Sequence, residues 1–259
     1  MSDHSTSVWP TGQHGPRAQL REAGCVAGTE FDRERIPPAV AAHAIAAWTH
    51  SGDLVLDPDC GAGTVLTEAL RAGRHALGLT VCKPWWTLAR ANVTAAKTAG
   101  AWCDGSVLET RPKMLATVGA AGLVGRVGLV LTALRTGPEG DLTESVVAEL
   151  AKSMRYCEPL LRPGGHVVIV ASPSRRSDKS LVDVTSLVVG AASAAGLTLV
   201  ERCIALAAEV RGNRLAAVAD RQAPHREVLV FQLTHEVVLA ASAVSPSRLR
   251  GYGFGRRAA

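Results

Sequence analysis

The sequence has few aromatic residues and no long apolar run. Only 4% of its 259 residues are Phe, Trp or Tyr, whereas 47% are hydrophobic. The core must therefore be built from Val, Leu, Ile and Ala, and the apolar fraction excludes a disordered chain. No run is long enough to cross a membrane as a helix. The first thirty residues lack a charged flank followed by an apolar core, so we expect no export signal, no membrane contact and a cytoplasmic location.

The sequence also lacks paired cysteines. None of its six cysteines belongs to a C-x-x-C motif, so neither a zinc site nor a disulfide framework is indicated, and we expect reduced, mostly buried thiols. His43 and His166 have no partner at metal-binding spacing, and no metal site is predicted. The cysteines are Cys25, Cys60, Cys82, Cys103, Cys157 and Cys203.

Apolar strand-like segments alternate with helical patterns from residue 36 onward. This alternation predicts an α/β fold: a seven-stranded, mostly parallel sheet with helices on both faces. No helical pattern separates the last two strands, so we expect that pair to be antiparallel. The strands are expected at 54–57, 76–80, 101–103, 127–132, 166–171, 197–206 and 226–233.

No internal repeat or second domain is visible. We expect a flexible leader over 1–35, one domain over 36–240 and a basic flexible tail over 241–259. The chain carries a formal net charge of +5, and four arginines lie in the tail. That tail is either an arm that follows a phosphate backbone or a solvated terminus, and four arginines alone favour the second.

The strongest motif is D-P-D-C-G-A-G-T at residues 57–64. A strand that ends in Asp57 leads through Gly61 and Gly63 into a helix from Thr64, which places bare backbone beside a ligand. The spacing does not match the G-x-G-x-x-G of dinucleotide sites. An acidic Asp57 would repel pyrophosphate but suits the ammonium of an amino-acid group. The motif thus favours S-adenosylmethionine (SAM) over a nicotinamide cofactor, and the alternative is a tight strand-to-helix turn without a ligand.

This stretch resembles the DNA amino-methyltransferases of the N4-cytosine and N6-adenine types, whose first motif reads D-P-F-C-G-S-G-T. The downstream E-A-x-x-x-G-R-x-x-x-G at 68–78 also fits, and the order of elements agrees over about 36–235. The resemblance implies a class I SAM-dependent methyltransferase with a Rossmann-like fold, acting on DNA or RNA. It implies these cofactor-binding residues: Asp57, Pro58, Cys60, Gly61, Ala62, Gly63, Thr64, Thr80 and Asp104.

Thr80 departs from the family pattern. The family ends its second strand with a carboxylate for the ribose hydroxyls, and a threonine hydroxyl forms one weaker hydrogen bond, so cofactor binding should weaken. Asp104 matches the position that contacts the adenine amino group, with a turn residue before Gly105 as the alternative. Trp85 and Trp86 are either core residues or an adenine-stacking face.

The catalytic motif of the family is degenerate here. Its fourth strand ends in [D/N/S]-P-P-[Y/F/W], whose oxygens orient the target amine and whose aromatic ring stacks on a flipped base. Those four positions are Ala133, Leu134, Arg135 and Thr136 in this chain. Two functions stay open: a SAM-dependent methyltransferase acting on nucleic acid, or an inactive methylase-fold protein that binds SAM or nucleic acid in a regulatory role. The oligomeric state is not indicated.

Overall fold

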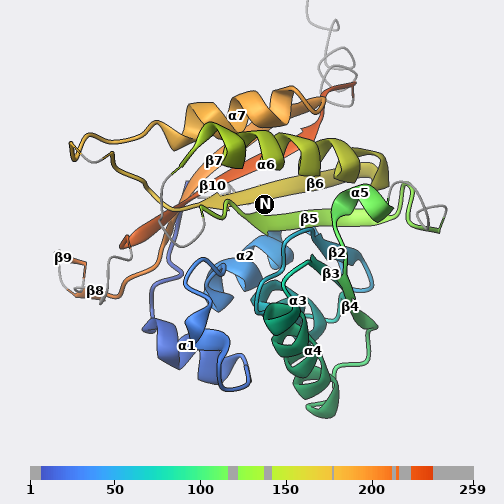
Figure 1. Cartoon of the computed structure of the whole chain (residues 1–259). Coiled ribbons are helices and arrows are strands. Elements are labelled where there is room, and N and C mark those ends of the chain that lie inside the picture. The colour runs from blue at the N-terminus through green and yellow to red at the C-terminus, as the bar shows by residue number, and fades with distance from the viewer. Residues whose placement is uncertain are drawn as a thin grey trace, which may run out of the picture.

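The computed structural model describes residues 7–115, 122–136, 142–176, 178–211, 214–215 and 223–235. Eight of its strands form one sheet, in the order β1-β7-β10-β6-β5-β2-β3-β4 (Figure 1). These strands are β1 (Val8–Trp9), β2 (Leu54–Asp57), β3 (His75–Thr80), β4 (Gly105–Glu109), β5 (Val127–Ala133), β6 (Leu161–Ala171), β7 (Leu197–Leu206) and β10 (His225–Leu233). A separate small ribbon joins β8 (Val210–Arg211) to β9 (Arg214–Leu215).

Helices cover both faces of the sheet, as the alternating pattern predicts. The helices α2, α3 and α4 pack on one face, and α6 and α7 pack on the other (Figure 1). The apolar side chains form two cores accordingly, with Leu66 in one and Met154 in the other. The helices are α1 (Pro16–Glu22), α2 (Pro38–Trp48), α3 (Thr64–Arg71), α4 (Lys83–Thr98), α5 (Pro112–Met114), α6 (Glu144–Cys157) and α7 (Val184–Ser193), with short 3-10 turns at Thr29–Phe31 and Glu158–Leu160.

The sheet is mostly parallel, and the predicted fold class is confirmed. Within this eight-stranded sheet, as the structure describes it, only β10 runs antiparallel to its neighbours, β6 and β7. The central strand β5 is buried on both faces, which explains its continuous apolar run. The carboxyl ends of β2, β3, β5 and β6 therefore meet at one edge, where open α/β sheets bind ligands.

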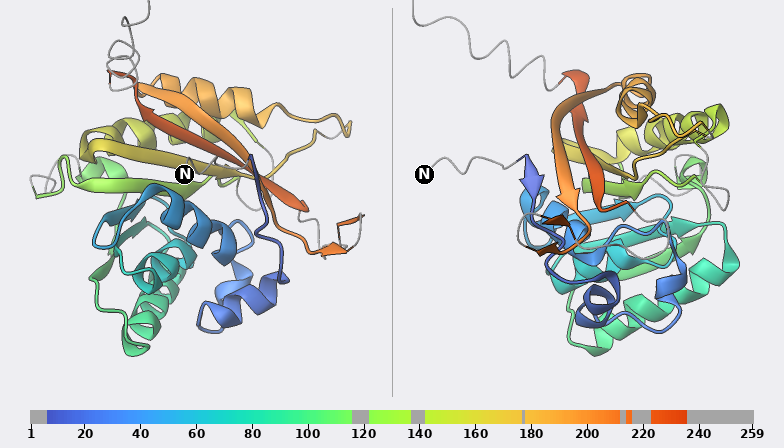
Figure 2. Two further views of the ribbon diagram at one scale, coloured as in Figure 1. Left: turned by 180° about the vertical axis from the view of Figure 1, so that it is seen from behind. Right: turned by 90° about the vertical axis from the view of Figure 1, so that its left-hand side faces the viewer.

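The N-terminal residues are folded from residue 7, which corrects the expected flexible leader. Val8 and Trp9 form β1, an eighth strand that pairs in parallel with β7 (Figure 2). The Trp9 side chain is 1% exposed, and its ring lies 4.4 Å from that of His43 on α2. Two residues carry no periodicity, so the sequence pattern could not predict this strand. Residues 1–6, and the expected tail over 241–259, lie outside the described residues.

The third predicted strand was placed too early. β4 runs from Gly105 to Glu109, whereas the expected strand at 101–103 lies in the link after α4. Trp102 in that link is 66% exposed, so its short apolar run does not mark a buried strand. β4 is an edge strand in which only Val107 is buried, so its own pattern is weak.

Across the residues that the structure describes, no helix has the length and apolar character needed to span a membrane. The cytoplasmic location stays a prediction. The same residues contain no group of three His, Cys, Asp or Glu side chains that could hold a metal ion.

Candidate cofactor site

The loop between β2 and α3 depends on its two glycines. Gly61 and Gly63 have φ angles of +48° and +84°, in the left-handed region that glycine adopts without strain. A Cβ atom on Gly63 would lie 2.9 Å from Cβ of Ala89, so this glycine lets α3 and α4 approach closely. A Cβ atom on Gly61 would lie 1.9 Å from Nη2 of Arg135. Gly63 is thus required by the packing of α3 against α4, and Gly61 by the close approach of the Arg135 side chain.

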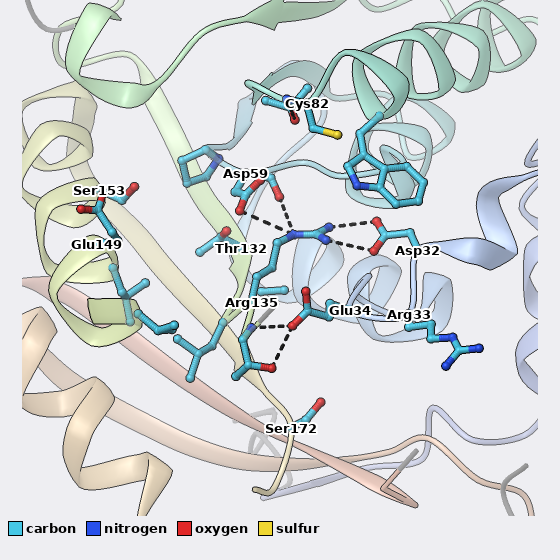
Figure 3. Close-up of a pocket in the computed structure, with 18 of the residues that line it drawn as sticks. Asp32, Arg33, Glu34, Asp59, Cys82, Thr132, Arg135, Glu149, Ser153 and Ser172 are labelled. Atoms are coloured by element: carbon cyan, nitrogen blue, oxygen red, sulfur yellow. Dashed lines mark hydrogen bonds and ion pairs between the residues drawn. The ribbon is translucent and has the colours of Figure 1, made fainter. Parts of the chain in front are cut away.

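A cavity of about 900 Å³ opens beside this loop, at the carboxyl ends of the strands (Figure 3). The loop and the end of β5 both contribute to its wall, so the two motifs singled out in the sequence meet in space. Thr80, Cys82 and Trp85 line it on the β3 side, and Glu149 and Ser153 of α6 line it opposite. The predicted site residues that line the cavity are Pro58, Thr80, Ala133, Leu134, Arg135 and Thr136.

Asp57 does not line this cavity, although the sequence suggested it as an ammonium partner. Its side chain is buried, and the Asp59 amide donates to its Oδ1 at 3.2 Å, with the Thr132 hydroxyl as a second partner. Burial raises the pKa of Asp57 to about 7. We conclude that Asp57 shapes the loop from below and is not placed to contact a ligand in the cavity.

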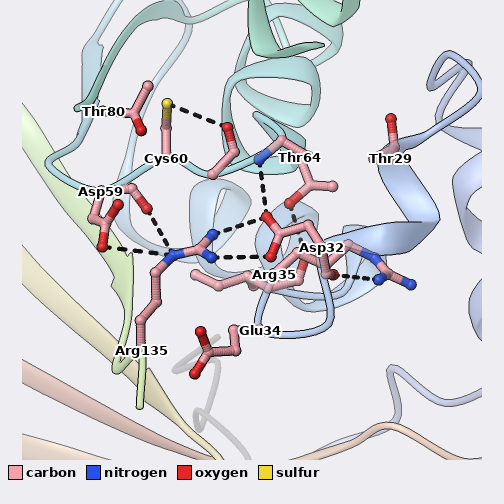
Figure 4. Close-up of polar contacts among 12 residues, drawn as sticks. Thr29, Asp32, Glu34, Arg35, Asp59, Cys60, Thr64, Thr80 and Arg135 are labelled. Carbon is pink, nitrogen blue, oxygen red and sulfur yellow. Dashed lines mark hydrogen bonds and ion pairs between the residues drawn. The ribbon is translucent and has the colours of Figure 1, made fainter. Parts of the chain in front are cut away.

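The other motif residues are committed to internal contacts. The Thr64 hydroxyl donates to the Ile36 carbonyl at 2.9 Å, and the Ala62 amide donates to Oδ2 of Asp32 at 2.8 Å (Figure 4). Cys60 is buried against Gly78, where an added Cβ would lie 2.9 Å from its sulfur. The N-terminal segment therefore covers the loop on the side of Ile36 and Asp32.

Thr80 lines the cavity at the end of β3. Its hydroxyl accepts a hydrogen bond from the Cys82 amide at 3.2 Å, and the residue is 4% exposed. The hydroxyl can still donate one hydrogen bond into the cavity. A single neutral bond agrees with the expectation that this position holds a ribose less firmly than a carboxylate would.

Arg135 lies across the face of Gly61 in a bidentate ion pair with Asp32. Its Nη1 and Nη2 donate to Oδ1 and Oδ2 of Asp32, both at 2.9 Å, and its Nε donates to the Asp59 carbonyl at 3.1 Å (Figure 4). Burial alone would raise the pKa of Asp32, but the hydrogen bonds and charge of Arg135 outweigh it and hold that pKa below its usual value. The pKa of Arg135 is raised in turn, because Asp32 outweighs the effect of burial.

A second contact joins the same two segments. Oε1 of Glu34 accepts hydrogen bonds from the Thr136 amide at 2.5 Å and from the Thr136 hydroxyl at 2.9 Å (Figure 3). The end of β5, where the resemblance predicts the position of the catalytic motif, is therefore tied to residues 32–34.

Asp32 and Glu34 were not among the predicted site residues, because residues 1–35 were expected to form a flexible leader. The charged run F-D-R-E-R just before Ile36 and the two prolines was the available signal. Its partners lie more than one hundred positions away in the chain, so no local pattern reveals the pairing.

Asp104 is not at the site, which corrects its assignment to the adenine. It precedes β4, at the amino end of the sheet, and its side chain is 92% exposed and 3.7 Å from His75 at the start of β3. The cavity lies at the opposite, carboxyl end. The error follows from placing the strand at 101–103, because the carboxyl end of the real strand is Glu109.

The comparisons with known proteins bear on this site. A sequence model of the family described as DNA methylase matches residues 2–83, a span that includes Asp32, Glu34 and the whole glycine loop. The match ends before β5. A comparison with curated proteins gives no match.

Three solved structures share the fold. TrmN from Thermus thermophilus is 18% identical with a TM-score of 0.54, over 83% of this chain and 53% of that protein. This chain thus spans about half the length of TrmN. Precorrin-6y C5,15-methyltransferase from Geobacter metallireducens is 13% identical with a TM-score of 0.55, over 87% and 98% of the two chains. A putative RNA methyltransferase from Pyrococcus horikoshii is 12% identical with a TM-score of 0.53, over 84% and 98%.

The chain has the class I methyltransferase fold. Its first third resembles the DNA methylases, and the solved structures with this fold include methyltransferases. The cofactor considered for the site is therefore SAM. The methyltransferase fold offers a fitting site for it: a glycine face that a Cβ would close, beside a cavity of about 900 Å³. Thr80 and Trp85 line the cavity and would hold the cofactor there. Gly61 does not line it, because the Arg135–Asp32 ion pair lies against its face.

Proposed function

We propose that the protein is a SAM-dependent methyltransferase that acts on nucleic acid. One observation carries this proposal: the glycine loop and the end of β5 open into a single cavity, so a cofactor and an acceptor would meet there. Bound SAM supplies an electrophilic methyl group on a sulfonium. The resemblance of residues 2–83 to DNA methylases supports nucleic acid as the acceptor.

The residues at the end of β5 restrict the chemistry. Ala133 carries no hydrogen-bond acceptor in its side chain, and no proline carbonyl follows it. A ring amine would thus lack the oxygens that tilt its nitrogen toward the methyl group. Glu149 and Ser153 offer side-chain oxygens on the opposite wall of the cavity. Both residues could orient an acceptor, and the Glu149 carboxylate is the candidate for taking up its proton.

A buried cation on the cavity wall suits an anionic acceptor. Arg226 on β10 is 6% exposed, and its Nη1 donates to the carbonyls of Ala223 and His225 at 3.0 and 3.2 Å. No carboxylate among the described residues pairs with it. Burial, followed by the charge of Arg35, lowers its pKa to about 10, so it stays a cation at neutral pH. A phosphate is a ligand that such a guanidinium binds well.

The test measures binding and transfer separately. Calorimetry with S-adenosylhomocysteine reports cofactor binding, and labelled SAM with pools of DNA and RNA reports transfer. We expect both, and we expect Arg226→Gln to weaken nucleic-acid binding and reduce its salt dependence by about one phosphate contact. Arg202→Gln, on the neighbouring strand, is the matched control, because Arg202 is half exposed and pairs with Glu227. Absence of cofactor binding in the wild type would overturn the proposal.

A second function is favoured by the contacts of Arg135 and Thr136. Both residues are engaged by Asp32 and Glu34, and neither offers the family's catalytic groups. A methylase-fold protein that binds SAM and nucleic acid without transfer, in a regulatory role, fits these contacts. Binding of both ligands with no label transferred to any pool would support this function over the first.

A further inference from the structure

We infer that Asp32 and Arg135 bind the two charged groups at the methionine end of SAM. Asp32 takes the ammonium and Arg135 takes the carboxylate, after the ion pair between them opens. This inference rests on the proposed function only in taking SAM as the ligand. It names two residues that the glycine motif does not include, one in the N-terminal segment and one at the end of β5.

The first argument is position. A Cβ atom added to Gly61 would lie 1.9 Å from Nη2 of Arg135 and 2.1 Å from Oδ2 of Asp32. Both charged groups therefore lie directly against the bare backbone of the loop. A ligand that uses this glycine face must displace the ion pair or enter into it.

The second argument is charge. The side chains of Asp32 and Arg135 are 2% and 15% exposed, so neither is well solvated. Removing one partner from a buried ion pair leaves the other charge uncompensated, which is strongly unfavourable. A ligand with a neutral end would leave both groups in that state. An amino-acid zwitterion gives each of them a new partner of the opposite sign, so the buried charges remain compensated.

The third argument is that each group has an anchor other than its partner. Nε of Arg135 donates to the Asp59 carbonyl at 3.1 Å, which leaves the two Nη atoms as a fork for a carboxylate. Oδ2 of Asp32 accepts from the Ala62 amide at 2.8 Å, which holds this carboxylate at the loop. The Glu34–Thr136 contact keeps the two segments together. The pair can therefore open by side-chain movement alone.

The two acids of the glycine motif itself are less well placed than Asp32. Asp57 does not line the cavity and is protonated below about pH 7 because of its burial. The Asp59 side chain is 56% exposed, and its Oδ2 lies 3.7 Å from Nε of Arg135. It supports Arg135 from the side, away from the fork.

The test compares two ligands by calorimetry. S-adenosylhomocysteine carries the amino-acid end, whereas 5′-methylthioadenosine has the same adenosine and sulfur without it. We expect the wild type to prefer S-adenosylhomocysteine by about a hundredfold or more, and Asp32→Asn or Arg135→Gln to reduce this preference at least about tenfold. Affinity for methylthioadenosine should be unchanged or higher, which also reports that each variant is folded.

The matched control is Arg162→Gln. Arg162 forms an ion pair with Asp53 at 2.8 Å, at the amino end of the sheet, so its loss should leave the preference unchanged. Arg135→Lys keeps the charge but not the fork, and should give an intermediate preference; it carries the test if Arg135→Gln does not fold.

Three results would overturn the inference. An unchanged preference in both Asp32→Asn and Arg135→Gln would show that the pair does not touch the amino-acid end. Tighter binding of S-adenosylhomocysteine to Asp32→Asn would show that the pair only blocks the site. If the wild type bound neither ligand, the proposed function would fail as well, whereas in the first two cases it would stand.

Discussion

Replacing Asp57 with asparagine should stabilise the protein, and the gain should grow with pH. Asp57 is fully buried at the end of β2, and burial raises the pKa of its carboxyl from 3.8 to about 7. The folded state therefore holds the neutral acid over a range of pH where the unfolded chain has lost that proton. Asparagine has nearly the same shape as the neutral acid, and its Oδ1 can still accept from the Asp59 amide.

The sign and the magnitude follow from proton linkage. Because the pKa of Asp57 is raised on folding, its contribution to the free energy of unfolding is fully present below pH 4. That contribution is lost progressively as the pH rises to about 7. The loss is about 1.4 kcal/mol per pH unit over roughly three units, which gives about 4 kcal/mol in total. An Asp57→Asn variant carries no such proton. Its stability relative to wild type should rise by about that amount from pH 4 to pH 8 and then level off.

The assay is urea-induced unfolding of both proteins at intervals from pH 4.5 to pH 8. Other titrating groups contribute equally to the two curves and cancel in the difference. Asp104→Asn is the control, because it makes the same chemical change at a side chain that is 92% exposed. A constant difference between wild type and Asp57→Asn over this range would refute the reasoning, since it would mean that Asp57 is ionised in the folded protein throughout.

Three further predictions concern the loop, the N-terminal strand and the cavity. Gly63→Ala should lower the unfolding free energy by about 1–3 kcal/mol, because it combines a positive φ with a Cβ 2.9 Å from that of Ala89; an unchanged thermal midpoint would contradict this. Trp9→Ala should lower the free energy of unfolding in urea by about 3–5 kcal/mol, because the Trp9 side chain is buried. A decrease below about 0.5 kcal/mol would mean that the N-terminal strand is not packed on the sheet. Cys82 is exposed and lines the cavity, so iodoacetamide should modify it first of the six cysteines, which mass spectrometry would detect. S-adenosylhomocysteine should slow this modification. Equal rates with and without the ligand would mean that the ligand binds elsewhere.

The centre of the sheet could be predicted because its strands are buried on both faces. The strands β2 and β5 begin at the predicted residues, since continuous apolar runs leave little ambiguity. β7 also begins at the predicted residue, although it contains charged residues and is only partly buried. β6 begins five residues before the predicted start, because Leu161 to Gly165 pass through a proline and two glycines that suggest a turn. β4 and β1 lie at the two edges, where short or half-exposed strands give weak patterns.

The site was predictable only in its local part. The glycine loop is encoded in eight consecutive residues, and its conformation follows from Gly61 and Gly63. Asp104 was misplaced because one wrong strand boundary moves a residue to the opposite end of a parallel sheet. Asp32 could not be found from sequence pattern, because its role depends on Arg135, which is 103 positions away.

The degenerate motif at the end of β5 and the ordered N-terminal segment are best understood as one feature. Were the strand to end in a proline pair, Asp32 would lie over Gly61 with the Ala62 amide as its main partner, and a buried carboxylate so placed is strongly unfavourable. Were Asp32 absent, the Arg135 guanidinium would lie against the loop with only Asp59 beside it. Asp32 and Arg135 thus compensate each other's buried charge. A substitution of either residue alone would leave the other one without its bidentate partner. On the predicted alignment with the DNA methylases, the end of β5 differs by more than the absence of a catalytic group. A cation lies at the glycine face, and a matching anion lies in the segment that covers it.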